Sequence, residues 1–172
     1  MKPLIQKIVV AIGGSDASIR TAKYAIVLAQ QYRCSLTAVY VVDTATLRQL
    51  VLTNIFVPDE SADYEKSLIE NGERYLKYVR ELASQKGLKI ETVLRKGSVF
   101  GEILKEAEEK SADLILLGSG EKNSRMERDN LSEAHKEILM HAKCSVLIVK
   151  EQDVEKIFKQ LYDSNSAPFK QL

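Results

Sequence analysis

Five short apolar runs, rich in β-branched residues, recur along the chain with longer helical patterns between them. The first of them, residues 7–12, suits a strand that is buried on both faces of a sheet, whereas residues 89–95 alternate between apolar and polar side chains and predict a strand with one exposed face at a sheet edge. The segments between them repeat apolar residues at spacings of three and four, which is typical of amphipathic helices. This alternation predicts a parallel sheet with helices on both faces. The expected strands are residues 7–12, 35–42, 89–95, 113–117 and 144–149.

The helical patterns predict where the remaining chain lies. Ser15 or Asp16 is expected to cap the first helix after the first strand. A long helix over about residues 61–87 contains Gly72, which costs about 1 kcal/mol relative to alanine and suggests a kink. Residues 44–60 are unusually apolar for a connection, so we expect a short helix packed on the body, the alternative being a lid or binding surface. Later helices are expected from residue 97, over 131–142 and around 154–161.

Length and charge exclude several classes of protein. The 172 residues suit one domain, and 25 Lys+Arg against 24 Asp+Glu leave a net charge of +1. That balance supplies no electrostatic footprint for a nucleic acid or an anionic membrane. No apolar run reaches the ~18 residues of a membrane helix, and the N-terminal stretch lacks a signal-peptide cleavage pattern. We therefore expect a cytoplasmic protein without nucleic-acid or membrane partners.

Metal and catalytic chemistry find little support in the sequence. Cys34 and Cys144 fit neither a disulfide framework nor a zinc cluster. His135 and His141 are six residues apart, which places them on different faces of a helix, so both are expected to be ordinary surface residues. The serines of the predicted loops have no histidine close by in the sequence. We therefore expect no metal site and no enzymatic activity.

Four segments resemble the universal stress protein family in order and spacing: residues 8–18, 36–43, 112–119 and 141–149. The resemblance covers residues 5–150. It implies a single doubly wound α/β domain over 1–150, with a five-stranded parallel sheet in order 3-2-1-4-5. Residues 151–172 then form a C-terminal helical extension and tail. The resemblance also implies a homodimer built through the fifth strand, with an unknown protein partner.

Family members that bind ATP resemble one another in two features. One is an Asp after the first strand, and the other is a Gly-x-x-Gly loop followed at a fixed spacing by Gly-Ser/Thr. Here Gly13 takes the place of the Asp, and Glu121 that of the second loop glycine. The closing pair corresponds to Ser132-Glu133, one residue late. If the pocket is used, the resemblance assigns to it Ile12, Gly13, Val41, Gly118, Ser119, Gly120, Ser132 and Glu133.

Glu133 is the departure with the largest electrostatic consequence. Two like charges 4 Å apart repel by ~4 kcal/mol at an effective dielectric constant of about 20. A structural role is available, because Asn130 as N-cap would place Glu133 at the third helical position in a capping box. The helix would then satisfy its own N-terminus where relatives hold phosphate.

These departures predict a regulatory or stress-response dimer that has no cofactor and does not bind ATP tightly. The alternative is a nucleotide sensor of the same family that binds ATP, ADP or AMP in a modified pocket. The sequence does not fit a phosphoacceptor receiver domain, because Gly13-Gly14 stands where such domains have an acidic pair after the first strand. The sequence does not fit a flavodoxin-like electron carrier either, because no Ser/Thr-rich phosphate loop follows the first strand.

Overall fold

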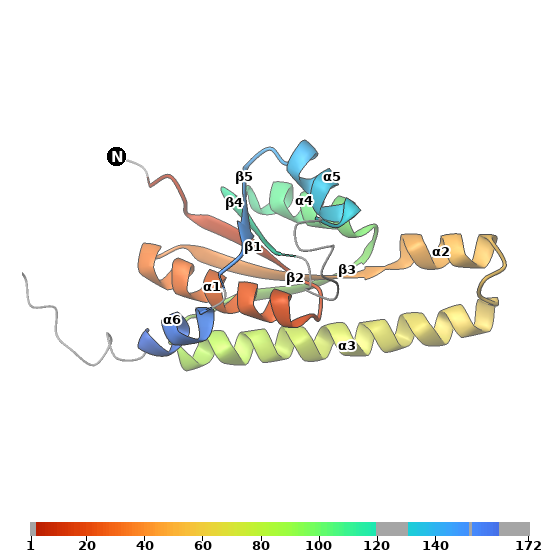
Figure 1. The fold of residues 1–172 in the computed structure, drawn as a ribbon, viewed down its shortest axis with the longest axis horizontal. Coiled ribbons are helices and arrows are strands. Elements are labelled where there is room, and N and C mark those ends of the chain that lie inside the picture. The colour runs from red at the N-terminus through yellow and green to blue at the C-terminus, as the bar shows by residue number, and fades with distance from the viewer. Residues whose placement is uncertain (1–2, 120–130, 152, 162–172) are drawn as a thin grey trace, which may run out of the picture.

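The computed structural model describes residues 3–119, 131–151 and 153–161. Its centre is a five-stranded parallel sheet in the order β3-β2-β1-β4-β5 (Figure 1). The α/β fold class, the sheet order and the C-terminal helix are therefore confirmed. The expected strand bounds differ from the observed ones by at most two residues. The strands are β1 (Lys7–Ile12), β2 (Ser35–Asp43), β3 (Glu91–Gly97), β4 (Leu114–Gly118) and β5 (Ser145–Val149).

Helices cover both faces of the sheet. Helices α1, α3 and α6 pack on one face and α4 and α5 on the other (Figure 1). The first helix begins as expected, because the Ser15 hydroxyl accepts a hydrogen bond from the Ser18 amide at 3.1 Å. The helices are α1 (Asp16–Tyr32), α2 (Thr44–Leu52), α3 (Pro58–Gln85), α4 (Val99–Lys110), α5 (Glu133–His141) and α6 (Val154–Gln160).

The central strand β1 explains where a ligand could bind. It pairs in parallel with β2 on one side and with β4 on the other. Val9 and Val10 are both almost fully buried, which is the pattern of a strand covered on both faces. The winding of the chain reverses at this strand, and such a reversal leaves a crevice outside the carboxyl ends of the neighbouring strands.

Gly72 packs against the sheet and does not mark the expected kink. Helix α3 is continuous from Pro58 to Gln85. A Cβ atom at Gly72 would lie 2.5 Å from Cδ1 of Tyr40 and 3.0 Å from Cδ1 of Leu94. The glycine therefore allows α3 to approach β2 and β3 closely. This close packing offsets the lower helix propensity of glycine.

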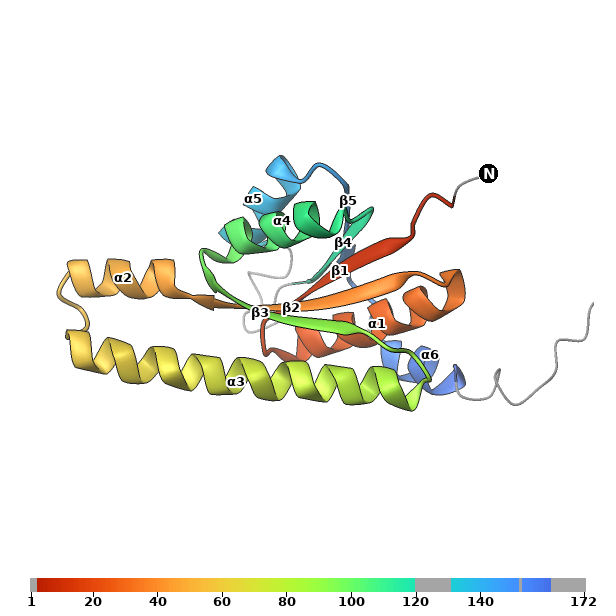
Figure 2. The same ribbon diagram turned by 180° about the vertical axis from the view of Figure 1, so that it is seen from behind.

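Residues 44–60 do contain a short helix, α2, but the expectation that it packs on the body was wrong. Helix α2 and the first part of α3 run antiparallel to each other and extend past the end of the sheet (Figure 2). We call the segment from Thr44 to Glu70 the arm. Strand β2 leads into it, and Asp43 caps α2 by accepting from the Thr46 amide at 3.0 Å. Within α2 only Thr44 and Leu47 are buried.

Helix α6 packs on α1 and leaves the outer edge of β5 uncovered by the described residues. Lys23 of α1 forms an ion pair with Glu155 of α6. The buried ring of Phe158 lies beneath the ammonium groups of Lys23 and Lys86, at 5.8 and 4.6 Å from the ring centroid. Strand β5 is the last strand of the sheet, so its outer backbone groups have no strand partner in the described chain.

No helix in the described ranges has both the length and the apolar character needed to cross a bilayer. Cys34 and Cys144 are both free, which agrees with their positions before strands that two other strands separate.

Candidate functional site

A cavity of about 270 Å³ opens at the carboxyl ends of β1, β2 and β4, the crevice that the sheet order predicts. Its floor is strand backbone and apolar side chain, and α4 and α5 each add residues to its walls. Among its described lining residues there is no Asp, Glu, Lys or Arg. They are Ala11, Ile12, Gly13, Ser15, Ala17, Ser18, Val39, Tyr40, Val41, Val99, Ile103, Gly118, Ser119 and His135.

The residues that the resemblance assigned to a nucleotide pocket fall into three groups. Ile12, Gly13, Val41, Gly118 and Ser119 come together as lining of the cavity. Ser132 and Glu133 do not line it and lie at the start of α5. Gly120 lies outside the described residues, as do Glu121 and the rest of the loop to Asn130.

The two glycines of this cavity have different physical explanations. A Cβ atom at Gly118 would lie 3.0 Å from the Thr21 hydroxyl and 3.3 Å from the Ala17 carbonyl oxygen. Gly118 is therefore explained by the close packing of β4 on α1. A Cβ atom at Gly13 would meet no heavy atom of the described residues within 4 Å, and the φ of Gly13 is not in the left-handed region. The backbone there would accept an aspartate, so the missing carboxylate is a difference in chemistry and not in space.

The N-terminus of α5 corrects the expected capping box. Ser132 is the N-cap, and its hydroxyl accepts a hydrogen bond from the His135 amide at 3.2 Å. Glu133 is therefore the first residue of the helix and not the third, and Asn130 lies outside the described residues. A serine hydroxyl caps a helix by the same chemistry as an asparagine side chain, because its oxygen accepts from a backbone amide of the first turn.

The environment of Glu133 also reduces its expected electrostatic effect. Its side chain is 82% exposed and lies 2.5 Å from Nζ of Lys136. Exposed ion pairs of this kind contribute less than about 1 kcal/mol, because water screens them. The repulsion of ~4 kcal/mol that the sequence suggested is therefore too large.

His135 was expected on the helix surface, and the structure places it in the cavity wall. Its side chain is half-buried, and Nδ1 has no hydrogen-bond partner among the described residues. Burial lowers the pKa of His135 below its ordinary value. The sequence does contain a signal for this position of His135. Ile138, three residues later on the same face of the helix, is completely buried.

We predict that His135 makes the stability of the fold depend on pH. The folded state keeps this imidazole neutral while the unfolded chain takes up a proton near pH 6.5. The free energy of unfolding should therefore fall as the pH drops below about 6.5. Urea unfolding at pH 7.5 and 5.5 measures this loss, which should shrink in His135→Gln. His141 is exposed, so His141→Gln is the matched control, and an equal loss in both variants would contradict the prediction.

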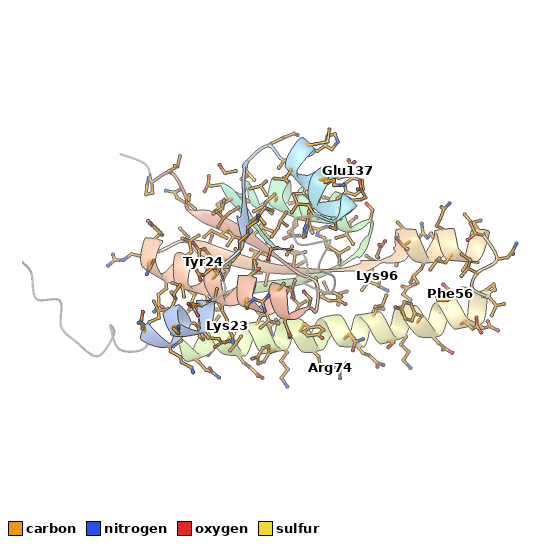
Figure 3. All side chains as sticks on the ribbon, viewed as in Figure 1. Lys23, Tyr24, Phe56, Arg74, Lys96 and Glu137 are labelled. Carbon is orange, nitrogen blue, oxygen red and sulfur yellow. The ribbon has the colours of Figure 1, made fainter. Side chains whose placement is uncertain are left out.

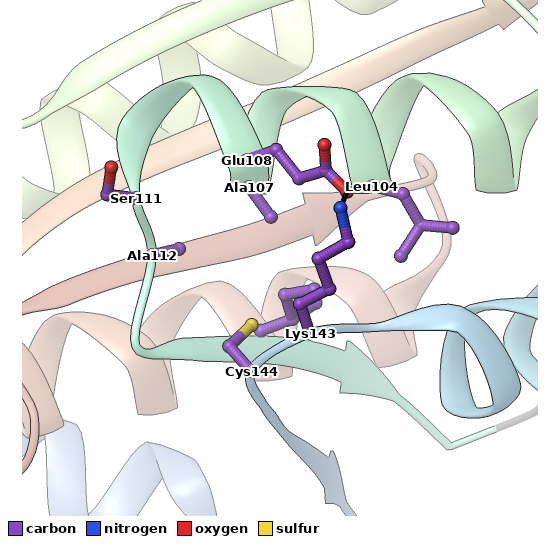
Figure 4. Close-up of a pocket in the computed structure, with 8 residues that line it drawn as sticks. Leu104, Ala107, Glu108, Ser111, Ala112, Lys143 and Cys144 are labelled. Carbon is purple, nitrogen blue, oxygen red and sulfur yellow. Dashed lines mark ion pairs between the residues drawn. The ribbon is translucent and has the colours of Figure 1, made fainter.

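A second cavity, of about 300 Å³, lies near the amino ends of β4 and β5 beside α4 (Figure 4). Its two charged residues, Lys143 and Glu108, form an ion pair at 2.9 Å. Burial raises the pKa of Cys144, which keeps its thiol protonated. The carboxyl ends of the strands lie elsewhere, so this cavity is the weaker candidate. The described ranges also contain no cluster of three residues able to hold a metal ion.

Comparison with known proteins identifies relatives of this chain and of its fold. The family model described as "Universal stress protein family" matches residues 4–150. Universal stress protein MJ0531 of Methanocaldococcus jannaschii is 34% identical over 88% of this chain and 86% of its own length. The solved structure of universal stress protein UspA from Lactobacillus plantarum has a TM-score of 0.70 at 21% identity, covering 87% of this chain and 100% of that one. A universal stress protein from Archaeoglobus fulgidus, solved in complex with dAMP, has a TM-score of 0.59 at 18% identity, covering 86% and 100%.

Proposed function

The chain belongs to the universal stress protein family, and from that premise we propose that it acts as a regulatory stress-response dimer without tight ATP binding. It carries out no chemical reaction in this proposal and works in the cytoplasm through a partner protein. The cavity at the carboxyl ends of the strands is then the remnant of a nucleotide site.

The observation that carries this proposal is the absence of charge from the described cavity lining. A triphosphate needs cationic groups or free backbone amides, and these interactions are strong because one partner is ionised. The described lining offers neither Lys nor Arg, and Gly13 supplies no carboxylate for a ribose hydroxyl. The first turn of α5 is also capped by its own Ser132, so one of its amides is already occupied.

The size of the cavity supports the same reading. Pockets for small molecules usually enclose about 300–1,000 Å³. The cavity here, at about 270 Å³, lies just below that range. A compact ligand fits such a space better than a nucleoside triphosphate.

A calorimetric titration with ATP tests the proposal on a restored site. The open space at Gly13 allows Gly13→Asp, which returns a carboxylate to the position the binders use. A hydrogen bond to a charged group is worth about 1.5–3 kcal/mol, so ATP affinity should rise about 10- to 100-fold. Gly13→Asn is the matched control, because it has the same shape without charge and should gain much less.

Ser132→Gly combined with Glu133→Ser tests the other departure. Since Glu133 is exposed and paired, this double variant should change ATP affinity by less than about fivefold. Low-micromolar ATP binding by the natural protein would overturn the proposal.

A second candidate is a sensor of an adenine mononucleotide. It is supported by Nδ1 of His135, which has no partner in the described part of the chain and can bond to a ligand beside Tyr40 and Val41. The Archaeoglobus fulgidus relative with dAMP makes a mononucleotide the natural ligand to try. The same calorimetry with AMP decides between the two, because a micromolar dissociation constant for AMP favours the sensor.

The proposed dimer forms through β5. Its Val146, Leu147 and Ile148 are half-buried, and an uncovered apolar edge strand is prone to pair with another chain. Pairing with a second β5 is self-complementary and closes both edges. Helix α6 packs on α1, so in the described chain it does not compete for this edge. Light scattering at micromolar concentration should give at least two copies, and a monomer would contradict the dimer.

A further inference from the structure

The amino ends of the strands form a hollowed surface at the end of the sheet away from the arm (Figure 2). Strand β2 begins at Ser35, but its pairing with β3 starts only where Thr37 lies opposite Glu91. The first two residues of β2 therefore have no strand partner on that side in the described chain. Two hollows, of about 430 and 670 Å³, flank this start of β3 and share residues 89–91. We call the two hollows together the amino-end groove.

The amino-end groove is cationic. Its described lining holds one carboxylate, that of Glu91, and four cations, which are Lys7, Arg80, Lys89 and Lys110. Glu91 pairs with Lys110 at 2.5 Å. Helices α3 and α4 both end beside the groove, and the negative ends of their dipoles offset about one further positive charge. An excess of about two positive charges remains in the lining.

The other three cations have no carboxylate partner in the described chain. Nζ of Lys7 donates to the Lys110 carbonyl oxygen at 3.0 Å, and the Arg80 guanidinium donates to the Thr92 hydroxyl. Lys89 is exposed and has neither a hydrogen bond nor an ion pair with a described residue. Bonds to neutral oxygens orient Lys7 and Arg80 but leave their charges uncompensated.

The cations at the carboxyl end of β3 are compensated by comparison. Figure 3 shows Lys96 toward the arm, where it pairs with Glu65 at 3.0 Å. Arg95 is paired with carboxylates of α4. At the amino end, the carboxylate of Asp113 accepts from two backbone amides at the start of β1 and lines neither hollow. The amino end of β3 therefore keeps positive charge that a partner can neutralise.

The rest of the lining indicates the chemistry of that partner. Leu88 and Ile90 add apolar surface to the groove, which a phosphate backbone cannot use, and Glu91 would repel an unbroken row of phosphates. Strand β3 is the last strand of the sheet on this side, so its outer backbone groups have no strand partner in the described ranges. An extended peptide can add to such an edge, and its side chains then alternate between the two faces. Carboxylates on that peptide would reach Arg80 on the α3 side and Lys110 on the α4 side.

We propose that an extended acidic segment of a partner protein binds in the amino-end groove by adding a strand to β3. This inference names the chemistry of the partner in the proposed function, and it rests on that function only in taking the partner to be a protein. Carboxylates of the segment pair with Arg80 and Lys89, and backbone hydrogen bonds to the outer edge of β3 hold the segment extended.

Fluorescence anisotropy with a labelled peptide that alternates glutamate and threonine tests the proposal. The natural protein should bind this peptide, and binding should weaken as NaCl is raised from about 50 to about 300 mM, because salt screens exposed charges. The same peptide with glutamine in place of glutamate should bind at least about tenfold more weakly. Arg80→Glu combined with Lys89→Glu should weaken binding of the glutamate peptide by at least about tenfold as well.

Arg48→Glu combined with Lys66→Glu is the matched control. Both residues are exposed cations of the arm, so the control changes the net charge by the same amount at the other end of the molecule. It should bind the glutamate peptide within about twofold of the natural protein. Hydrogen exchange provides a second measurement, because an added strand should slow the exchange of backbone amides over residues 88–92 of the natural protein.

Three results would overturn the proposal. They are the absence of peptide binding by the natural protein, equal losses in the two charge-reversed variants, and tighter binding of an oligothymidine than of the peptide. Gly13→Asp lies at the opposite end of the sheet and should leave peptide binding unchanged. Failure of the ATP predictions and failure of this proposal are therefore distinguishable.

Discussion

Replacing Arg95 with methionine is expected to lower the free energy of unfolding by about 3–5 kcal/mol. Arg95 of β3 forms ion pairs with three carboxylates of α4, those of Glu102, Glu106 and Glu109. The Glu106 side chain is only 1% exposed, and after the change its nearest cation would be Lys110 at 3.9 Å. A buried carboxylate that loses its main partner keeps its desolvation penalty without compensation.

Denaturant unfolding at neutral pH measures this loss. Adding Glu106→Gln to Arg95→Met should recover most of the stability, because the buried charge is then removed with its partner. Lys96→Met is the matched control, since the Lys96–Glu65 pair is far more exposed and its loss should cost less than about 1 kcal/mol. A loss below about 1 kcal/mol in Arg95→Met would show that this network contributes little.

Replacing Gly72 with leucine is expected to cost about 3 kcal/mol, because the close approach of α3 to the sheet leaves no room for a side chain. The new Cβ atom alone would lie 2.5 Å from the ring of Tyr40, which is buried and stacked on Tyr75. On an exposed helix face, removal of a glycine would instead stabilise by about 1 kcal/mol. The sign of the change therefore separates packing from propensity.

Thermal and denaturant unfolding of Gly72→Leu measure this cost. Ser67→Leu on the exposed face of α3 is the matched control and should change stability by less than about 0.5 kcal/mol. Truncating the opposing ring with Tyr40→Leu should make the Gly72→Leu change less costly. A stabilised Gly72→Leu protein would mean that α3 does not lie as close to β2 as the structure has it.

Strands and sheet order were predictable because their signals are local and repeated. The β-branched run at Lys7–Ile12 is followed by glycines and a serine cap, and β3 and β4 likewise run into Gly97-Ser98 and Gly118-Ser119. The order of the strands came from the resemblance to the family and is confirmed by the pairing of β1 with β2 and β4. The direction of the arm was not predictable, because nothing in the apolar pattern of residues 44–60 says which surface those residues face.

The site was harder to predict than the fold. Ile12, Gly13, Val41, Gly118 and Ser119 could be placed together, because each sits in a strand or directly follows one. The start of α5 was predicted wrongly, because Asn130 and Ser132 are both capping residue types and stand two positions apart in the sequence. Only the hydrogen bond from the His135 amide to Ser132 identifies Ser132 as the N-cap. With Ser132 as the N-cap, Glu133 is the first residue of α5, and its side chain is exposed.

Equilibrium binding of labelled ATP to the natural protein tests the central claim most directly. Because the described cavity wall carries no charged residue, we expect a dissociation constant weaker than about 100 μM. With protein and ATP each at about 10 μM, less than about one tenth of the sites should then be occupied. Occupancy of half the sites or more under these conditions would contradict the account and make the chain an ATP-binding member of the family.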